Sequence, residues 1–553
     1  MSSLRTLAAN RILAPLSLAG LLLGAAAFLA ALTPSLIPRS GPIQGAVAGL
    51  AFAMGYGLGA GATILWNWMG LPSLPRPVMR TVGRVMIVMV VVLVLAGLLM
   101  ARGWQESIHA ALGLPAVETV RPLVIAGVAF AVLLVAIFLG RAFRLLKDFY
   151  ILPIERVLPA RVSFLVASIF AAWSFWAIGN GFLLEAALRG LDSTYREIDQ
   201  RRHAEEPRPD DPLKTGSADS LIAWDGLGAE GRARILSGPA AGEIAELAGG
   251  AVMPPLRVFV GLNSAESVEA RAELALAELL RIGAFDRRLL VIATPTGTGW
   301  VDPAAMMPLE ILHRGDVATV SVQYSYLPSW LSLLVEPAYG QETAQAVFRA
   351  VYGHWHTLPE TERPRLFLFG LSLGALNSDL ASNDFDIVGD PYDGAFWVGP
   401  PFASRTWREV TGSHREGSPW WLPESRNSRL FRFMTNADLT QLTADNWGPV
   451  RILYLQYPSD PIVFFERDSW RRPPPWLEGS RAPDVPQQLA WVPGVTFLQL
   501  IVDMMTATTV PRGVGHVYAA SHYLDGWVAL TEPEGWAKEN LAALKNWLDA
   551  KGL

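Results

Sequence analysis

Residues 365–377, RLFLFGLSLGALN, decide the fold of this chain of 553 residues. The apolar first half predicts a buried strand, and the small residues of the second half predict the start of a helix. A G-x-S-x-G pattern on such a turn forms a nucleophile elbow, in which a strained backbone exposes the hydroxyl of Ser372. Gly370 and Gly374 would keep side chains out of the tight corner. The alternative is an ordinary strand-to-helix turn in which the serine only caps the helix.

Short apolar runs rich in β-branched and aromatic residues recur along the rear of the chain and alternate with helical stretches. The expected strands are 257–261, 289–294, 317–323, 366–369, 394–398, 452–456 and 495–502. Amphipathic helices are expected at 266–282, 341–355 and 534–548. This alternation predicts an α/β fold with a mainly parallel sheet that helices cover on both faces.

A serine nucleophile in such a sheet needs an orienting acid and a base, in the chain order serine, acid, histidine. Asp460 follows the strand expected at 452–456 and so lies at the carboxyl edge, where open α/β sheets bind ligands. Its alternative role is an Asx turn before Pro461. Asp390 and Asp393 are rivals, but they precede a strand and therefore lie at the opposite edge.

Two of the eight histidines, His516 and His522, follow Asp460 in the chain. His516 lies in a glycine-containing loop after the last expected strand, from which its ring can reach back to Ser372. His522 lies among aromatic residues of an expected helix, where packing explains it better. We predict that Ser372, Asp460 and His516 form a catalytic triad.

Acyl transfer also needs two N–H groups that hold the oxyanion. The first candidate is the N–H of Leu373, directly after the serine. The second comes from the loop PTGTGW, residues 295–300, in which Thr296 and Gly297 are candidate donors. A phosphate-binding loop or an ordinary turn are the alternatives, although no Gly-Lys-Ser/Thr follows as a phosphate loop requires.

The front of the chain is apolar. Five stretches are long enough to span a bilayer and nearly free of charge, namely 12–32, 43–66, 85–101, 122–140 and 162–184. Lysine and arginine gather in the loops on one side, whereas the loops on the other side carry only Arg39, Arg102 and Arg121. The positive-inside rule then predicts a cytoplasmic N-terminus. With an odd number of spans, the rear of the chain lies outside the cytoplasm.

Three domains follow from this composition. We expect a transmembrane helical domain at 1–188, a polar linker with some helix at 189–251, and a catalytic domain at 252–553. Within the last, a long aromatic-rich insertion between the strands at 394–398 and 452–456 is expected to form a lid.

Composition also excludes several classes of function. The net charge is −5, and no basic stripe with interleaved aromatic residues is present, so nothing predicts nucleic-acid binding. The absence of cysteine excludes disulfides, thiol catalysis and thiolate metal sites. His354 and His356 lack a convincing third ligand, so we expect no metal and no cofactor.

Several blocks occur in an order that is more specific than the elbow alone. They are RVFVGLNS at 257–264, GAFDR at 283–287, PTGTGWVDP at 295–303, QYSYLPSWLS at 323–332, the elbow, and GVGHVY at 513–518. In these blocks the chain resembles a bacterial membrane-anchored α/β-hydrolase family with an N-terminal multi-span domain and a C-terminal catalytic domain. The resemblance covers almost the whole chain. It implies the α/β-hydrolase fold and a serine hydrolase of unassigned substrate, with Ser372, Asp460 and His516 at the motif positions.

Together these features predict an integral protein of the bacterial inner membrane that cleaves a hydrophobic acyl ester through an acyl-enzyme, as an esterase or lipase does. Its expected partners are the lipid bilayer and a small-molecule or lipid acyl substrate. Two alternatives stay open. An acyltransferase would use the same three residues with an alcohol or sugar in place of water, and a non-catalytic membrane binding or accessory protein would use them only for packing.

Overall fold

The computed structural model describes residues 16–72, 75–179, 206–327, 332, 337–382, 389–425, 428–443 and 447–553. The chain forms two compact units. The helical unit comprises the described parts of Met1–Gly190, Glu466–Arg481 and Val485–Thr506. The sheet unit comprises those of Leu191–Phe465, Ala482–Asp484 and Ala507–Leu553. Between Asp460 and His516 the chain therefore returns to the helical unit twice, at Glu466–Arg481 and at Val485–Thr506.

A seven-stranded sheet forms the centre of the described sheet unit. Its strands are β1 (Leu256–Val260), β2 (Leu289–Thr294), β3 (Val317–Val322), β4 (Arg365–Leu371), β5 (Gly394–Val398), β6 (Phe431–Met434) and β7 (Arg451–Leu455). Their order is β1-β3-β2-β4-β5-β7-β6, and every pair is parallel. Nearly all strand residues are buried, because helices cover both faces of a parallel sheet. The predicted α/β-hydrolase fold is confirmed, with β4 at the middle of the sheet.

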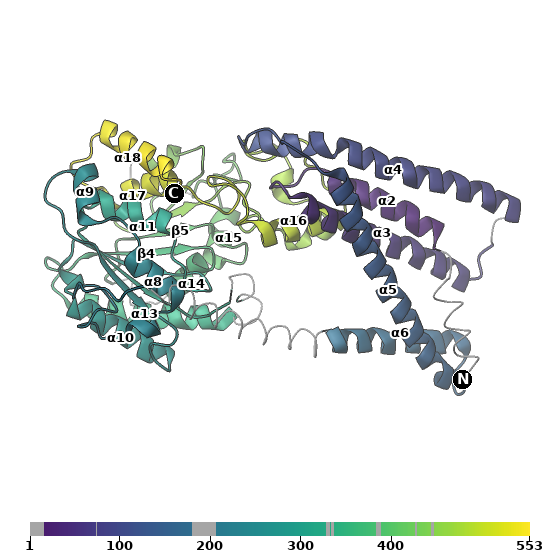
Figure 1. Ribbon diagram of the computed structural model, residues 1–553, viewed down its shortest axis with the longest axis horizontal. Helices are drawn as coiled ribbons and strands as arrows, with labels where there is room; N and C mark the ends of the chain where they lie inside the picture. Colours follow the sequence, from purple (N-terminus) through teal and green to yellow (C-terminus); the bar gives the residue numbers. More distant parts are fainter. Residues whose placement is uncertain are drawn as a thin grey trace. The chain divides into compact units, whose positions relative to one another are not determined.

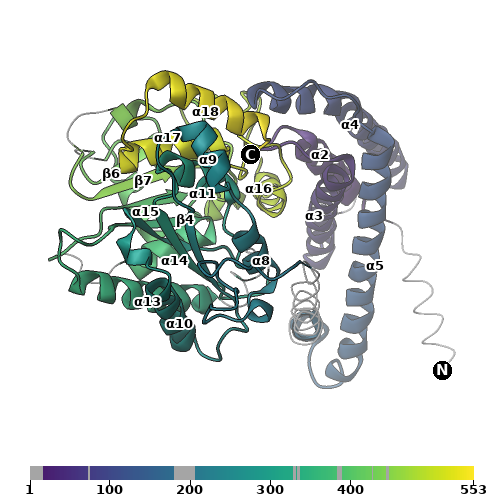
Figure 2. The same ribbon diagram turned by 60° about the vertical axis from the view of Figure 1, so that its left-hand side comes forward.

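Two layers of helices cover this sheet (Figures 1 and 2). One face carries α10 (Val268–Arg281), α13 (Pro337–Thr357) and α14 (Leu373–Ala381), and the other carries α9 (Ala241–Ala248), α11 (Pro303–Leu312), α17 (Ala520–Thr531) and α18 (Lys538–Ala550). Ser267 is the N-cap of α10, and its hydroxyl oxygen accepts a hydrogen bond from the N–H of Ala270. The expected helices at 266–282, 341–355 and 534–548 correspond to α10, α13 and α18.

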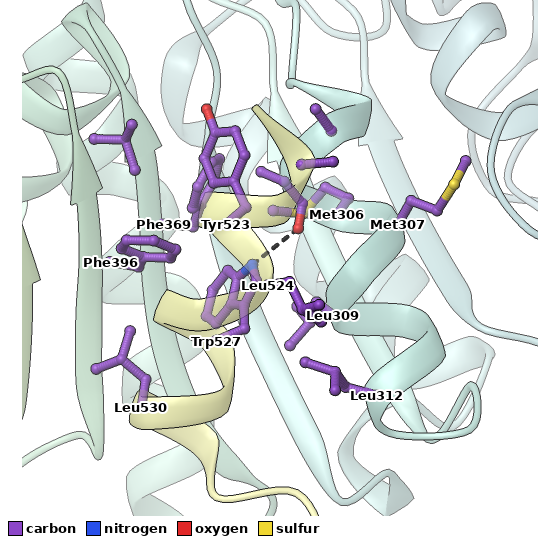
Figure 3. Packing of buried hydrophobic residues seen from close by; sticks show 14 of the residues in the cluster. Met306, Met307, Leu309, Leu312, Phe369, Phe396, Tyr523, Leu524, Trp527 and Leu530 are labelled. Atoms are coloured by element: carbon purple, nitrogen blue, oxygen red, sulfur yellow. Dashed lines mark hydrogen bonds between the residues drawn. The ribbon is translucent and has the colours of Figure 1, made fainter. Parts of the chain in front are cut away.

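The core beneath the second layer is built around Trp527 of α17 (Figure 3). This side chain is fully buried, and its ring centroid lies 5.9 Å from that of Phe369 and 5.1 Å from that of Phe396. Its indole N–H donates to the carbonyl of Ala305 at 2.8 Å, as the dashed line in Figure 3 marks. One residue therefore fastens α17 to β4, β5 and α11. Since α17 follows the loop of His516, this packing also fixes one end of that loop.

The expected strand at 495–502 is wrong, because these residues form the helix α16 (Val495–Thr506). In a helix, Thr496, Gln499 and Asp503 share one face, and all three are buried. The run of β-branched and apolar residues concealed this spacing. The insertion between β5 and β7 also differs from a simple lid, since it contains α15 (Arg405–Gly412) and the strand β6, which extends the sheet.

The helical unit consists mainly of α2 (Leu18–Leu32), α3 (Gly41–Trp68), α4 (Arg76–Ala111), α5 (Pro122–Ile154) and α6 (Ala160–Trp176). Among the described residues, four helices are long and apolar enough to cross a membrane: Gly41–Trp68, Pro77–Ala111, Pro122–Ile154 and Ala160–Gly179. Large apolar side chains such as Leu99 and Phe138 are 82% and 70% exposed, which fits contact with lipid. These helices indicate membrane association.

The first and last expected spans lie partly outside the described residues. The helix α2 has 15 residues from Leu18 onward, which is shorter than a full span. The predicted location of the rear of the chain depends on an odd number of spans, so it stays a prediction.

A buried ion pair binds α16 to the rest of the helical unit. Nη2 of Arg39 lies 2.7 Å from Oδ1 of Asp503, and the same nitrogen donates to the carbonyl of Gln499 at 2.9 Å. The N–H of Leu36 donates to the other carboxylate oxygen at 3.2 Å. Removing one partner would leave an uncompensated charge in the interior, so this pair locks α16 in place.

The expected linker at 189–251 is described from Glu206 onward. It contains α8 (Gly228–Leu236) and α9. From α8, Arg234 reaches Oε1 of the fully buried Glu310 at 3.3 Å, while Arg257 of β1 reaches Oε2 at 2.7 Å. Burial opposes ionisation of Glu310, but the charge of Arg257 prevails and lowers its pKa. This segment is therefore packed on the sheet unit by a buried charge cluster.

Candidate active site

Ser372 occupies a strained turn between β4 and α14. Its φ and ψ are 57° and −122°, which a residue with a side chain rarely adopts. A Cβ atom on Gly370 would lie 2.3 Å from the carbonyl carbon of Gly374, and one on Gly374 would lie 2.3 Å from the carbonyl oxygen of Thr294. The Ser372 side chain makes no capping hydrogen bond. The turn has the geometry expected of a nucleophile elbow, and ordinary helix capping does not account for the serine.

The end of β5 connects the serine to the histidine. The N–H of Ser372 donates to the carbonyl of Val398 at 2.9 Å. The next residue, Gly399, has a φ of 52°, and a Cβ atom there would lie 2.7 Å from Cε1 of His516. The imidazole therefore lies directly against the backbone of Gly399, one residue from the carbonyl that binds the elbow.

Asp460 and His516 form a buried pair. Oδ2 of Asp460 lies 2.6 Å from Nδ1 of His516, the carboxylate is fully buried, and the histidine is 6% exposed. Because a carboxylate only accepts hydrogen bonds, Nδ1 is the donor of this bond, and in the neutral ring Nε2 is then an acceptor. Oδ1 of Asp460 accepts the N–H of Ile462 at 2.8 Å, so the carboxylate also makes the Asx turn. Asp460 therefore makes the Asx-turn contact and the contact to His516 at the same time.

The second ring nitrogen, Nε2 of His516, is buried and makes no hydrogen bond to any residue that the structure describes. The structure thus brings Ser372 and His516 to the same edge without a hydrogen bond between them. Such bonds are often long in unliganded enzymes and tighten when substrate binds. A buried acceptor without a protein partner costs free energy in a folded protein, so Nε2 of His516 is a candidate for contact with a substrate.

Tyr518 is a partner of Asp460 that the sequence did not reveal. Its hydroxyl donates to Oδ2 of Asp460 at 2.7 Å. Burial, and then the charge of Asp460, raise the pKa of Tyr518 well above its ordinary value, so the phenol keeps its proton and remains a donor. In the sequence, the one feature that points to Tyr518 is its position two residues after His516, within the block GVGHVY.

The loop of His516 is held on both sides. The N–H of Gly515 donates to Oγ of Ser459 at 3.1 Å, and the N–H of His516 donates to the carbonyl of Ala507 at 3.3 Å. Ser459 in turn donates its N–H to the buried carboxylate of Asp484 at 3.1 Å. These bonds join the residue before the acid to the residue before the base, so the two loops hold each other.

The rival residues have structural partners elsewhere. Asp390 forms an ion pair with Arg363 at the other edge of the sheet, and its Oδ2 also lies 2.7 Å from Nδ1 of His356. Asp393 accepts the N–H of Leu366, at the start of β4, at 2.8 Å.

His522 is packed in the core of the unit. Its Nδ1 lies 2.6 Å from the hydroxyl of Tyr457, and burial lowers its pKa to about 4. It therefore stays neutral and contributes to packing in the core, in agreement with the packing interpretation of the sequence.

The candidate oxyanion donors occupy two neighbouring segments. Leu373 is the first residue of α14, where N–H groups have no carbonyl partner within the helix. The close approach of Gly374 to Thr294 and Pro295 brings the loop 295–300 against the elbow. In that loop the N–H of Thr296 donates to the carbonyl of Trp300 at 3.0 Å, and Gly297 is buried in the same turn. The Thr296 N–H is therefore engaged in this state.

Asp302 is a further buried carboxyl at the end of this loop. Its Oδ1 caps α11 by accepting the N–H of Ala304 at 2.9 Å, and its Oδ2 accepts the hydroxyl of Tyr523 at 3.0 Å. Burial raises the pKa of Asp302 to about 6. Among the residues that the structure describes, no group of three or more His, Cys, Asp or Glu side chains could hold a metal ion.

A doubly covered parallel sheet, a strained serine after its middle strand and a buried His–Asp pair at the same edge define the α/β-hydrolase class of protein. The chain belongs to the alpha/beta-hydrolase family. The family model matches residues 256–544, and a model of the family's N-terminus matches residues 32–239. The resemblance of the sequence blocks to an α/β-hydrolase family with an N-terminal helical region is thereby confirmed. No curated protein and no solved structure matches the chain.

Proposed function

We propose that this chain is a membrane-associated serine hydrolase that cleaves an acyl ester bond through an acyl-enzyme on Ser372. The observation that carries the proposal is the buried Nε2 of His516, which has no partner among the described residues while Nδ1 is held by Asp460 at 2.6 Å. In its neutral form an imidazole held in this way acts as a general base through Nε2.

In the proposed mechanism, Oγ of Ser372 attacks the ester carbonyl carbon while Nε2 of His516 takes the hydroxyl proton. The carbonyl oxygen becomes an oxyanion, which the N–H of Leu373 and a donor from Thr296 or Gly297 stabilise. Because the Thr296 N–H now binds Trp300, its use requires the loop to shift. The tetrahedral intermediate expels the alcohol, which receives the proton from Nε2. Water then repeats the sequence, releasing the acid and restoring the serine.

Aromatic side chains gather in the segments next to Asp460. The N–H of Phe402 donates to the carbonyl of Ile462, two residues after the acid, and the Phe402 ring centroid lies 4.9 Å from that of Phe465. The adjacent Phe464 packs its ring 4.8 Å from that of Trp420. Such aromatic surfaces favour apolar ligands. We propose lipid or other hydrophobic acyl esters as the substrate class.

The test is covalent labelling of the full chain in detergent with a fluorophosphonate probe. Wild type should label, and Ser372→Ala and His516→Ala should not, because the first lacks the nucleophile and the second lacks the base. Ser382→Ala is the matched control, since this serine lies at the end of the same helix, where its hydroxyl donates to the carbonyl of Asp379 and is hydrogen-bonded to Tyr392. Equal labelling of wild type and Ser372→Ala would overturn the proposal.

The substrate class has its own test. We expect p-nitrophenyl esters with long acyl chains to be hydrolysed with higher kcat/KM than the acetate ester. A preference for acetate would argue against a hydrophobic acyl pocket while leaving the serine mechanism intact.

We further propose that the N-terminus is cytoplasmic and that the sheet unit lies outside the cytoplasm. The asymmetry of lysine and arginine supports this orientation. A reporter that is active only in the cytoplasm, fused after Leu553, should stay silent. A strong signal would mean an even number of spans.

A further inference from the structure

The helical unit contains a cavity that no part of the proposed mechanism uses. It lies between α3, α5 and α6 and has a volume of about 540 Å³, within the range of roughly 300–1,000 Å³ typical of ligand sites. Most of its lining is apolar, and one end carries Arg141, Arg144 and Lys147 of α5. We propose that this cavity binds an anionic phospholipid, with its acyl chain along the apolar wall and its phosphate at the basic end.

The glycines of α3 show that this space is distinct from ordinary helix packing. Four of them permit close contact with neighbouring helices. A Cβ atom on Gly45 or Gly49 would lie 2.8 Å from a carbonyl oxygen of α5, and one on Gly55 or Gly59 would lie 2.4 or 2.5 Å from a carbonyl oxygen of α2. These positions follow the small-residue rule for membrane helices.

Gly57 and Gly61 lie on the same helix and line the cavity, but no neighbouring helix that the structure describes approaches them closely. A Cβ atom on either would have no described atom within 4 Å, and the same holds for Gly140 on the α5 wall. The absence of a side chain at these three glycines leaves open space in the cavity and does not bring two helices into close contact. An apolar wall with unused space suits an acyl chain.

The basic end supplies the complementary charge. Arg141, Arg144 and Lys147 recur every three residues on α5, so they lie along neighbouring turns. Nζ of Lys147 lies 4.4 Å from the ring centroid of Phe164 on α6, and 3.6 Å from the carboxylate of Asp148. Among the described residues, no carboxylate lines the cavity itself. Arginine and lysine between membrane helices recognise lipid phosphates, so the charge and the apolar wall together fit an anionic phospholipid.

The experiment measures the lipid retained by the full-length protein after exchange into nanodiscs. The nanodiscs contain equal amounts of phosphatidylglycerol and phosphatidylcholine, and native mass spectrometry counts bound lipids after mild release. Wild type should retain phosphatidylglycerol preferentially. Arg144→Gln/Lys147→Gln removes two phosphate contacts and should weaken that retention about 30-fold. Arg80→Gln/Arg84→Gln on α4, which removes the same charge away from the cavity, should not.

A second variant tests the apolar wall with the charges intact. Gly57→Leu/Gly61→Leu fills the cavity from two positions where a Cβ atom has open space, so phosphatidylglycerol should be lost. Its control is Gly103→Leu/Gly127→Leu, at two membrane-helix glycines that also have open space but lie outside the cavity. Because these changes only add apolar side chains to apolar helices, they keep the test decisive if the charge variant fails to fold.

Equal retention of the two lipids by wild type would overturn the proposal. Undiminished retention of phosphatidylglycerol by the folded charge variant or by the filled variant would do the same. Neither readout depends on Ser372, so failure here is separable from failure of the hydrolase proposal.

Discussion

Gly399→Ala tests whether the backbone after β5 positions the histidine for attack at Ser372. The residue has a φ of 52°, and its added methyl would lie 2.7 Å from Cε1 of His516 and 2.9 Å from Oη of Tyr518. Carbon atoms at rest lie about 3.5–4.0 Å apart, so the imidazole has to move by about 1 Å. A displacement of this size at a catalytic group lowers rates on the order of 100-fold.

The substitution also carries a backbone cost that has to be separated from this displacement. An alanine in the left-handed region costs about 1–2 kcal/mol wherever it stands. Gly417→Ala is the matched control, because Gly417 has a φ of 88° and open space within 4 Å of its Cβ position. Both variants carry the backbone strain of a positive φ, whereas only Gly399→Ala displaces the imidazole of His516.

The assay is the second-order rate of fluorophosphonate labelling of the full chain, with thermal unfolding as a check of folding. We expect Gly399→Ala to label about 100-fold more slowly than wild type and Gly417→Ala to label at nearly the wild-type rate. If the two variants label alike in a folded state, the proposed link between Gly399, His516 and Ser372 is refuted.

Three further predictions concern stability, measured as the free energy of unfolding of the full chain in detergent. Burial raises the pKa of the Asp302 carboxyl from 3.8 to about 6, so its ionisation destabilises the fold as pH rises through that interval. Asp302→Asn should therefore leave the free energy of unfolding unchanged near pH 4 and increase it by about 3 kcal/mol near pH 8. An equal increase at both pH values would contradict this prediction. Glu310→Gln should lower the free energy of unfolding by about 3–5 kcal/mol, because two buried arginines lose their anionic partner. Glu534→Gln, which removes an exposed ion pair, should change it little. Equal effects of the two substitutions would refute the role of the buried charge cluster. Arg39→Met should lower the free energy of unfolding by about 3–5 kcal/mol, because it leaves the Asp503 carboxylate buried without a partner. Adding Asp503→Leu removes that charge and should restore much of the lost stability. Additive losses from the two substitutions would contradict the role of the buried pair.

Much of the sheet could be predicted from the sequence because its strands are buried on both faces. A run such as 289–294 is apolar up to its last residue, Thr294, and the structure gives β2 the same bounds. The strand β6 escaped prediction because it has four residues and contains Arg432, which its context buries. The helix α16 was mistaken for a strand because hydrophobicity alone does not distinguish the two in a short run.

The candidate site could be predicted in part. Chain order pointed to Asp460 and His516, and the structure brings them into contact at 2.6 Å. Their roles in catalysis, and that of Ser372, stay predictions. The contact of Tyr518 with Asp460 was beyond the sequence, because a tyrosine near a histidine does not reveal where its hydroxyl points.

The most direct test of the account is to locate the covalent adduct. After labelling of the folded wild-type chain, trypsin releases the peptide 366–405, which contains the four serines Ser372, Ser378, Ser382 and Ser404. Fragment-ion spectra should place the phosphonate on Ser372 alone. An adduct on another serine, or an unmodified Ser372 in folded protein after prolonged labelling, would contradict the assignment of Ser372 as the nucleophile.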